Sequence, residues 1–278
     1  MAIYLLEIEY DGRPFCGWQY QKESISVQGI VQQALEQLTQ SQTMIYGAGR
    51  TDKGVHAYGQ CAHFHSTKDL PLRSWHRGLN FYLKDWPIRI LNVYPMTENF
   101  HARFSAQSRC YVYKILPRST ALDRFRAWSV EYNIHCDWLR QALELFIGTH
   151  NFSNFRSRDC QSASPIKTID FCQLRTFHGQ IYIFFQARSF LHHQVRMIVG
   201  ACMEVARGRW NLDKIQSLLY HPHPYKKSVT APAHGLYFLG AVYPRSAFLE
   251  DTYFDPWKAY RDNNHVSSPG QNTPFSLE

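Results

Sequence analysis

Apolar and polar residues alternate along the chain with two periods, and these periods predict most of its secondary structure. The first hundred residues indicate a strand, a helix, a strand, a helix and a strand, at 2–10, 27–38, 59–66, 71–83 and 87–94. In the first of these helices the apolar residues recur three or four positions apart, which is typical of an amphipathic helix. Ser26 precedes it, and we expect its hydroxyl to cap the first turn.

The second part of the chain continues in the same way. The pattern predicts a strand, a helix, two strands, a long helix and a final strand, at 108–117, 137–147, 168–177, 180–187, 192–207 and 236–243. We expect Asp137 to cap the helix at 137–147. His178-Gly179 should form the turn between the paired strands, and Asn211 should cap a short helix before the last strand.

These elements indicate an α+β protein built from two halves, each a sheet covered by helices. We place the halves at residues 1–105 and 106–244. Residues 245–278 combine prolines with Asn, Ser, Gly and Asp and show little periodicity, so we expect a largely flexible tail. The 278 residues are enough to bury a sizeable core.

Charge and cysteine usage narrow the class of protein. The formal net charge is +8, and basic residues are interleaved with aromatic ones near 109–126. This favours a polyanionic partner such as RNA or DNA only modestly over an ordinary basic surface. The seven cysteines are scattered without a Cys-x-x-Cys pair, which is typical of a reducing cytoplasm. We find no membrane-spanning run and no signal peptide, and therefore expect a cytoplasmic protein.

The segment Gly47-Ala-Gly-Arg-Thr-Asp-Lys-Gly54 is the strongest candidate for chemistry. Its glycines allow sharp turns and close approach, but it matches neither a phosphate-binding P-loop nor a dinucleotide loop. It offers one carboxylate, Asp52, near Arg50, Lys53 and His56. We expect these cationic residues to keep Asp52 ionised as a nucleophile or base. A turn aspartate bonded to its own loop is the alternative interpretation.

The segment around Asp52 also resembles the signature of the TruA family of tRNA pseudouridine synthases. Six further segments resemble family motifs in the same order, and the resemblance covers about residues 1–244. These segments begin at Glu9, Ser26, Phe100, Gly148, Phe190 and Ala231.

The resemblance implies both a fold and an activity. The implied fold is the pseudouridine synthase fold, in which two ferredoxin-like halves join in a mixed, mainly antiparallel sheet flanked by helices. The implied reaction is isomerisation of uridine to pseudouridine in the tRNA anticodon arm, at positions 38 to 40. The resemblance also implies a homodimer that binds tRNA and needs neither a cofactor nor a metal.

Particular residues match the family by position. Asp52 matches the catalytic aspartate, Tyr111 the tyrosine that stacks on the target uracil, and Arg196 the arginine paired with the carboxylate. Arg50 matches the arginine that helps to extrude the target nucleotide. Leu236 matches an apolar position in the pocket.

Three further residues complete the expected RNA-binding set. They are Lys53, His56 and Arg109. Alternation places Arg109, Tyr111 and Tyr113 on one strand face as a possible base-stacking platform, with Tyr113 expected in the core.

Other groups of residues are weaker candidates for a metal or catalytic site. Cys61, His63 and His65 share a strand face and could bind zinc, but a fourth ligand is missing. His192 and His193 are placed at a helix start, where neighbouring side chains point apart, so we do not expect them to act together. A non-catalytic RNA-binding protein and a metal-dependent nuclease remain as alternatives. The nuclease would need further carboxylates near Asp52.

Overall fold

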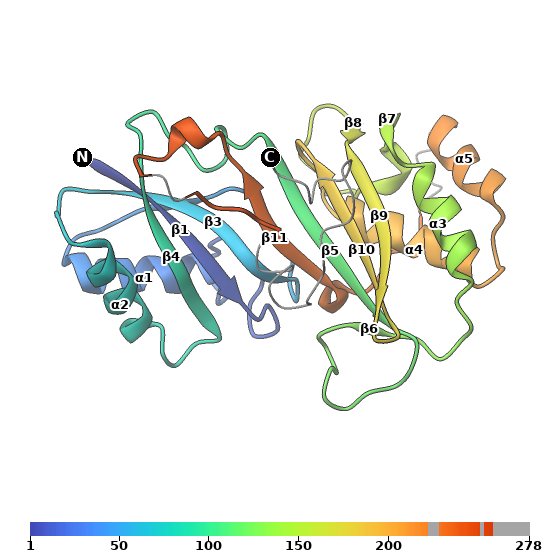
Figure 1. The fold of residues 1–278 in the computed structure, drawn as a ribbon, viewed down its shortest axis with the longest axis horizontal. Helices are drawn as coiled ribbons and strands as arrows, with labels where there is room; N and C mark the ends of the chain where they lie inside the picture. Colours follow the sequence, from blue (N-terminus) through green and yellow to red (C-terminus); the bar gives the residue numbers. More distant parts are fainter. Residues whose placement is uncertain (222–227, 251–252, 258–278) are drawn as a thin grey trace.

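The computed structural model describes residues 1–221, 228–250 and 253–257. Its main sheet runs through the whole molecule (Figure 1). The strands are β1 (Ala2–Tyr10), β2 (Ile45–Gly47), β3 (His56–Ser66), β4 (Ile88–Met96), β5 (Ser108–Leu116), β6 (Trp128–Ser129), β7 (Gly148–Asn151), β8 (Ile166–Ile169), β9 (Phe171–Phe177), β10 (Gln180–Ala187) and β11 (Leu236–Val242).

The sheet has the order β4-β1-β3-β11-β5-β10-β9, with β2 added to β3 and β6 to β5. The last strand, β11, pairs in parallel with β3 and antiparallel with β5. It therefore joins β3 and β5 at the centre of one sheet. The remaining pairs are antiparallel except for β5 with β6. The predicted α+β fold with a mixed, mainly antiparallel sheet is confirmed.

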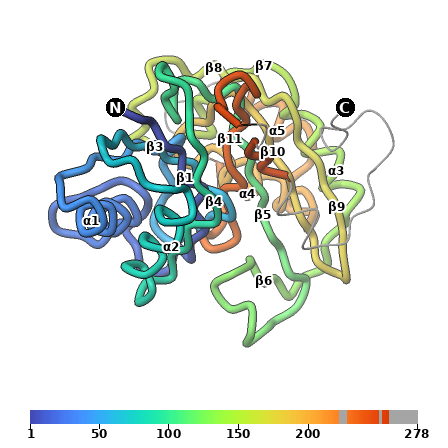
Figure 2. Tube along the Cα trace, turned by 60° about the vertical axis from the view of Figure 1, so that its left-hand side comes forward, coloured from blue at the N-terminus to red at the C-terminus, as the bar shows by residue number. Residues whose placement is uncertain are grey.

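The helices form two groups at opposite ends of the sheet (Figures 1 and 2). They are α1 (Val27–Thr39), α2 (Leu72–Tyr82), α3 (Cys136–Glu144), α4 (Gln194–Ala206) and α5 (Leu212–Tyr220). In the first group, Trp75 of α2 packs on Tyr4 and Phe64, with ring centroids 5.3 and 5.1 Å apart. In the second group, α4 is buried along nearly its whole length. No helix in the described part of the chain is long and apolar enough to cross a membrane.

The predicted N-terminal helix caps are confirmed at two positions and wrong at one. Ser26 accepts a hydrogen bond from the Gly29 amide, and Asn211 accepts one from the Lys214 amide. Asp137, however, does not cap α3, which begins one residue earlier. It lies in the first turn and pairs with Arg140.

Two further expectations differ from the structure in detail. The strand expected at 168–177 is divided into β8 and β9 at Asp170. The beginning of the expected tail packs on the sheet, where Phe248, Phe254 and Trp257 are buried. Apolar side chains thus hold residues 245–250 and 253–257 in place despite their lack of periodicity. Residues 258–278 lie outside the described part of the chain.

Candidate active site

Asp52 lies in the loop that joins β2 to β3, and the backbone of a second loop holds this segment. Residues Gly17 and Asp52 form an isolated β-bridge, and the Trp18 amide donates to the Thr51 carbonyl at 3.1 Å. Gly17 has φ +123°, and a Cβ there would lie 2.4 Å from the Thr51 carbonyl oxygen. A side chain at this position would therefore clash with the loop. The Tyr10 hydroxyl adds a 2.7 Å hydrogen bond to that of Thr51.

Three side-chain nitrogen atoms lie around the Asp52 carboxylate. The Arg196 Nη1 atom donates to Oδ2 at 2.9 Å. The Nε2 atoms of His192 and His193 lie 3.2 Å from Oδ1 and 3.3 Å from Oδ2. The Asp52 and Arg196 side chains are only 21% and 14% exposed. A charged carboxylate this far from solvent needs such partners to remain ionised.

The expectation that His192 and His193 point apart is wrong. It assumed helical geometry, but α4 begins only at Gln194, and His193 has φ +65°. The Gln194 side chain accepts from the Leu191 amide at 2.7 Å and closes this turn. Both imidazoles consequently face the same carboxylate, with ring centroids 4.1 Å apart. Sequence reasoning missed both residues.

The electrostatics favour an ionised Asp52. Burial raises the pKa of its carboxyl, but the hydrogen bonds and charges of His192, His193 and Arg196 outweigh this effect and leave the pKa below its usual value. The hydrogen bond to Asp52 raises the pKa of His192, whereas burial lowers that of His193. The permanent positive charge at the carboxylate is therefore the guanidinium of Arg196.

Arg196 is fixed by contacts on both sides. Its Nε donates to the Ala231 carbonyl at 2.9 Å, while its own carbonyl accepts from the Ala231 amide. One turn later, Gly200 allows α4 to approach the same segment, because a Cβ there would lie 2.1 Å from the Val229 carbonyl oxygen. The guanidinium thus has little freedom to leave Asp52.

Tyr111 of β5 lies in the apolar wall of the same site. Its ring is buried between Phe190 and Phe238, at centroid distances of 5.2 and 4.9 Å. Its hydroxyl points toward the loop that carries Asp52, 3.9 Å from where a Cβ on Gly49 would lie. Burial raises the pKa of the hydroxyl, so it stays protonated near neutral pH.

The sequence predicts Leu236 in the pocket and Tyr113 in the core, and these residues lie on the adjacent strands β11 and β5. Leu236 is buried at the start of β11, opposite Tyr113. Tyr113 is fully buried, as expected for a core residue, and donates to the Pro232 carbonyl at 2.7 Å.

The expectation that Arg50, Lys53 and His56 keep Asp52 ionised is wrong, because the groups that lower its pKa are His192, His193 and Arg196. The described groups that contact it come from the segment at residues 192–196 instead. Arg50 is exposed and donates to Gln19 at 3.1 Å, and Lys53 is exposed. Backbone turns separate side chains that are adjacent in sequence, so the residues flanking Asp52 point elsewhere.

Two of the expected RNA contacts have structural partners instead. His56 is 2% exposed, and its two ring nitrogens contact the Gly12 amide and the Phe125 carbonyl. Arg109 donates to the backbone carbonyls of four residues, namely Ala48, Arg103, Ala106 and Arg188. Arg109 therefore fixes the start of the loop that carries Asp52. Direct RNA contact by His56 and Arg109 is thus corrected to a structural role for each.

One group of described residues has the spacing of a metal site. The ligand atoms of Asp52, His192 and His193 lie within 4.8 Å of one another. The guanidinium of Arg196 contacts the same carboxylate, however, and its charge opposes a bound cation. Among the described residues, Cys61, His63 and His65 do not have the spacing of a metal site. His63 instead accepts a hydrogen bond from the Ala102 amide.

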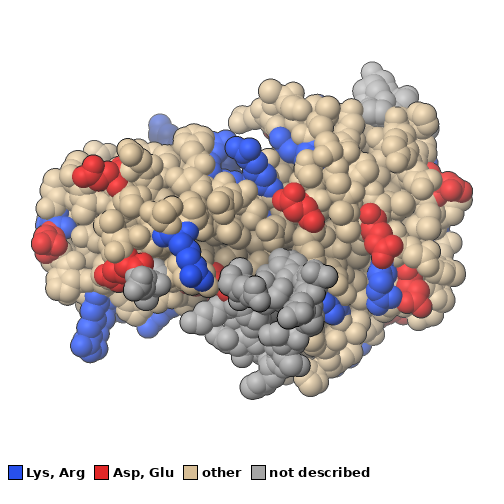
Figure 3. Space-filling model, turned by 45° about the horizontal axis from the view of Figure 1, so that its top comes forward, with Lys and Arg blue, Asp and Glu red and all other residues tan. Residues whose placement is uncertain are grey.

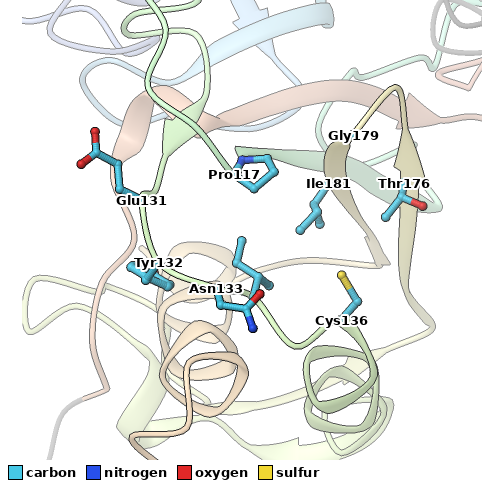
Figure 4. Close-up of a pocket in the computed structure, with 9 residues that line it drawn as sticks. Pro117, Glu131, Tyr132, Asn133, Cys136, Thr176, Gly179 and Ile181 are labelled. Carbon is cyan, nitrogen blue, oxygen red and sulfur yellow. The ribbon is translucent and has the colours of Figure 1, made fainter.

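A separate hollow of about 480 Å³ lies between the segment at 131–136 and the turn joining β9 to β10 (Figure 4). Its lining includes Glu131, Cys136 and Thr176 and none of the residues around Asp52.

The chain is similar to known proteins over most of its length. A family model described as tRNA pseudouridine synthase matches residues 7–105 and 142–244, which include Asp52 and Arg196. The tRNA pseudouridine synthase A of Paramagnetospirillum magneticum is 41% identical, covering 88% of this chain and 97% of its own length. That of Ehrlichia chaffeensis is 42% identical, covering 86% and 99%. The chain therefore belongs to the tRNA pseudouridine synthase family.

Proposed function

We propose that this chain converts uridine to pseudouridine in the anticodon arm of tRNA, at positions 38 to 40, with Asp52 as the catalytic carboxylate. The observation that carries the proposal is the pairing of the Asp52 carboxylate with Arg196 beside the buried ring of Tyr111. A family match over both halves of the chain supports the same activity.

The reaction suits such a site because it is an isomerisation. The bond between N1 of uracil and C1′ of ribose breaks, the base turns, and a bond forms between C5 and C1′. The proton lost from C5 is balanced by one gained at N1, so no oxidant, reductant or water is consumed. We therefore propose that the enzyme needs neither a cofactor nor a metal.

Asp52 can contribute by either of two routes. Its carboxylate attacks the base or the sugar covalently, or it stabilises the ribose and removes a proton after the glycosidic bond breaks. In both routes Arg196 keeps the carboxylate charged and oriented. Tyr111 provides an aromatic surface for the uracil and a protonated hydroxyl near the loop.

The charge of the chain fits an RNA substrate. The net charge is +8, and Figure 3 shows Lys and Arg side chains at several places on one face, interspersed with Asp and Glu. Such a surface attracts phosphates without selecting a sequence. We further propose that Arg50 and Lys53, both exposed beside Asp52, contact the RNA. We also propose that the chain acts as a homodimer in the cytoplasm.

The direct test replaces Asp52 with Asn and measures pseudouridine in an unmodified tRNA transcript. We expect no detectable product, with tRNA affinity kept within about tenfold because phosphate contacts dominate binding. Asp137→Asn, at an exposed position on α3, is the matched control and should retain activity. Product formation by the Asp52 variant would refute the role of Asp52. Wild-type protein that binds tRNA without turnover would instead favour a non-catalytic RNA-binding protein.

A further inference from the structure

Phe125 combines an unusual backbone conformation with an exposed aromatic ring. It lies in the long connection between β5 and β6, which extends beyond the sheet near the start of β11 (Figure 1). Its φ is +64°, a region that a bulky residue rarely adopts, and its side chain is 46% exposed. Strain of this kind persists only where the surroundings enforce it, and it is concentrated at functional sites.

Two buried side chains hold this backbone in place. The Gly12 amide donates to Nδ1 of His56 at 3.1 Å, which leaves the proton of the neutral ring on Nε2. Nε2 can therefore donate to the Phe125 carbonyl, at 3.0 Å. The Tyr237 hydroxyl donates to the next carbonyl, that of Arg126, at 2.5 Å. His56 and Tyr237 are themselves stacked, with centroids 4.6 Å apart.

The ring of Phe125 lies at the edge of the catalytic site. Its centroid is 5.8 Å from that of His234, with the planes at 88°. Burial lowers the pKa of His234, and the nearby charge of Arg196 adds to this effect. The preceding residue, Ala233, lies near Gly54 in the loop that carries Asp52. A Cβ on Gly54 would be 3.6 Å from the Ala233 Cβ. His234 thus contacts Phe125, and its neighbour Ala233 lies close to the loop that carries Asp52.

The chemistry around Phe125 suits an unpaired nucleotide. The guanidinium of Arg124 lies 4.8 Å from the ring centroid, so a cation accompanies the aromatic surface. Exposed aromatic rings beside cationic groups bind single-stranded nucleic acid by stacking on the bases. A base removed from its helix beside the target uridine would need such a surface.

We propose that Phe125 stacks on a base adjacent to the target nucleotide, that Arg124 binds its phosphate, and that His56 is a positioning residue for Phe125. This inference rests on the proposed RNA-modifying function and assigns a binding subsite within it. It also explains why a histidine only four residues from Asp52 is buried away from the carboxylate.

The first experiment compares Phe125→Ala with Phe125→Trp. We expect the alanine variant to lower kcat/KM on tRNA by about five- to a hundredfold, the range expected for one stacked base. The tryptophan variant should keep most of the activity. Phe81→Ala removes a phenylalanine that is 62% exposed on α2 and is the matched control. Unchanged kcat/KM for Phe125→Ala would overturn the proposal.

A second measurement follows stacking directly, without turnover. An anticodon stem-loop carrying 2-aminopurine beside the target position should change its fluorescence on binding wild-type protein, and this change should be lost with Phe125→Ala. His56→Gln should weaken it, and adding His56→Gln to Phe125→Ala should have no further effect. Equal fluorescence changes for wild type and Phe125→Ala would overturn the inference. This readout still applies if the wild type binds RNA but forms no pseudouridine, which would refute only the proposed function.

Discussion

Replacing Arg196 with Gln tests whether the pair with Asp52 stabilises the protein as well as the reaction. The variant loses the 2.9 Å hydrogen bond to Oδ2 and can lose the one to the Ala231 carbonyl. Hydrogen bonds to charged groups contribute about 1.5–3 kcal/mol, and breaking a fully buried pair costs about 3–5 kcal/mol. Because Asp52 and Arg196 retain 21% and 14% exposure, we expect a loss of about 2–3 kcal/mol.

Thermal unfolding measures this loss, which should lower Tm by about 5–10 °C. The pKa of Asp52 should also rise, because burial is then opposed by fewer partners, and the acid limb of the pH–rate profile should move to higher pH. Arg140→Gln removes an exposed pair on α3 and should cost less than about 1 kcal/mol. If the Arg196 variant matched this control in both Tm and pH profile, the pair would have no role in stability or ionisation.

Three further predictions address the surroundings of Asp52. The folded-state pKa of His192 is raised by its hydrogen bond to Asp52, so its contribution to stability is present below the unfolded pKa and lost as pH rises through the folded value. Denaturant titrations should show that His192→Asn removes this part of the pH dependence. Gly17→Ala should lower the free energy of unfolding by more than about 1 kcal/mol and lower kcat. Gly179 also has positive φ but has open space around it, so Gly179→Ala should lose only the stability that backbone strain removes. Arg109→Met should reduce kcat in single-turnover assays with little change in tRNA affinity, because its donors bind backbone carbonyls; a large loss of affinity alone would contradict this assignment.

Periodicity in the sequence predicts the elements but not their arrangement. The strand at 236–243 is recognisable from its apolar residues, yet nothing local indicates that it pairs with β3 and β5 at the centre of the sheet. Such pairing depends on contacts between distant segments. The same holds for Asp52 and Arg196, which are 144 residues apart and were connected only through the family resemblance.

Residue type and spacing also predict the wrong direction for several side chains. The sequence places His56 near the candidate loop and Arg109 on the strand face of Tyr111, and this predicts RNA contacts for both. Their hydrogen-bonding atoms face backbone groups instead. Helical geometry predicts that His192 and His193 point apart, but both residues lie in a turn before α4. The direction of a side chain depends on local backbone angles, which the hydrophobic pattern does not specify.

The central position of β11 has a consequence for how the protein is made. During synthesis, β3 and β5 emerge from the ribosome long before residues 236–242, so the edges that later pair with β11 remain open meanwhile. A chain interrupted before residue 236 would carry Asp52 and Arg196 without the strand that joins β3 to β5. Partly synthesised enzyme should therefore be prone to aggregation, and activity should arise only when almost the whole family-matched region has been translated.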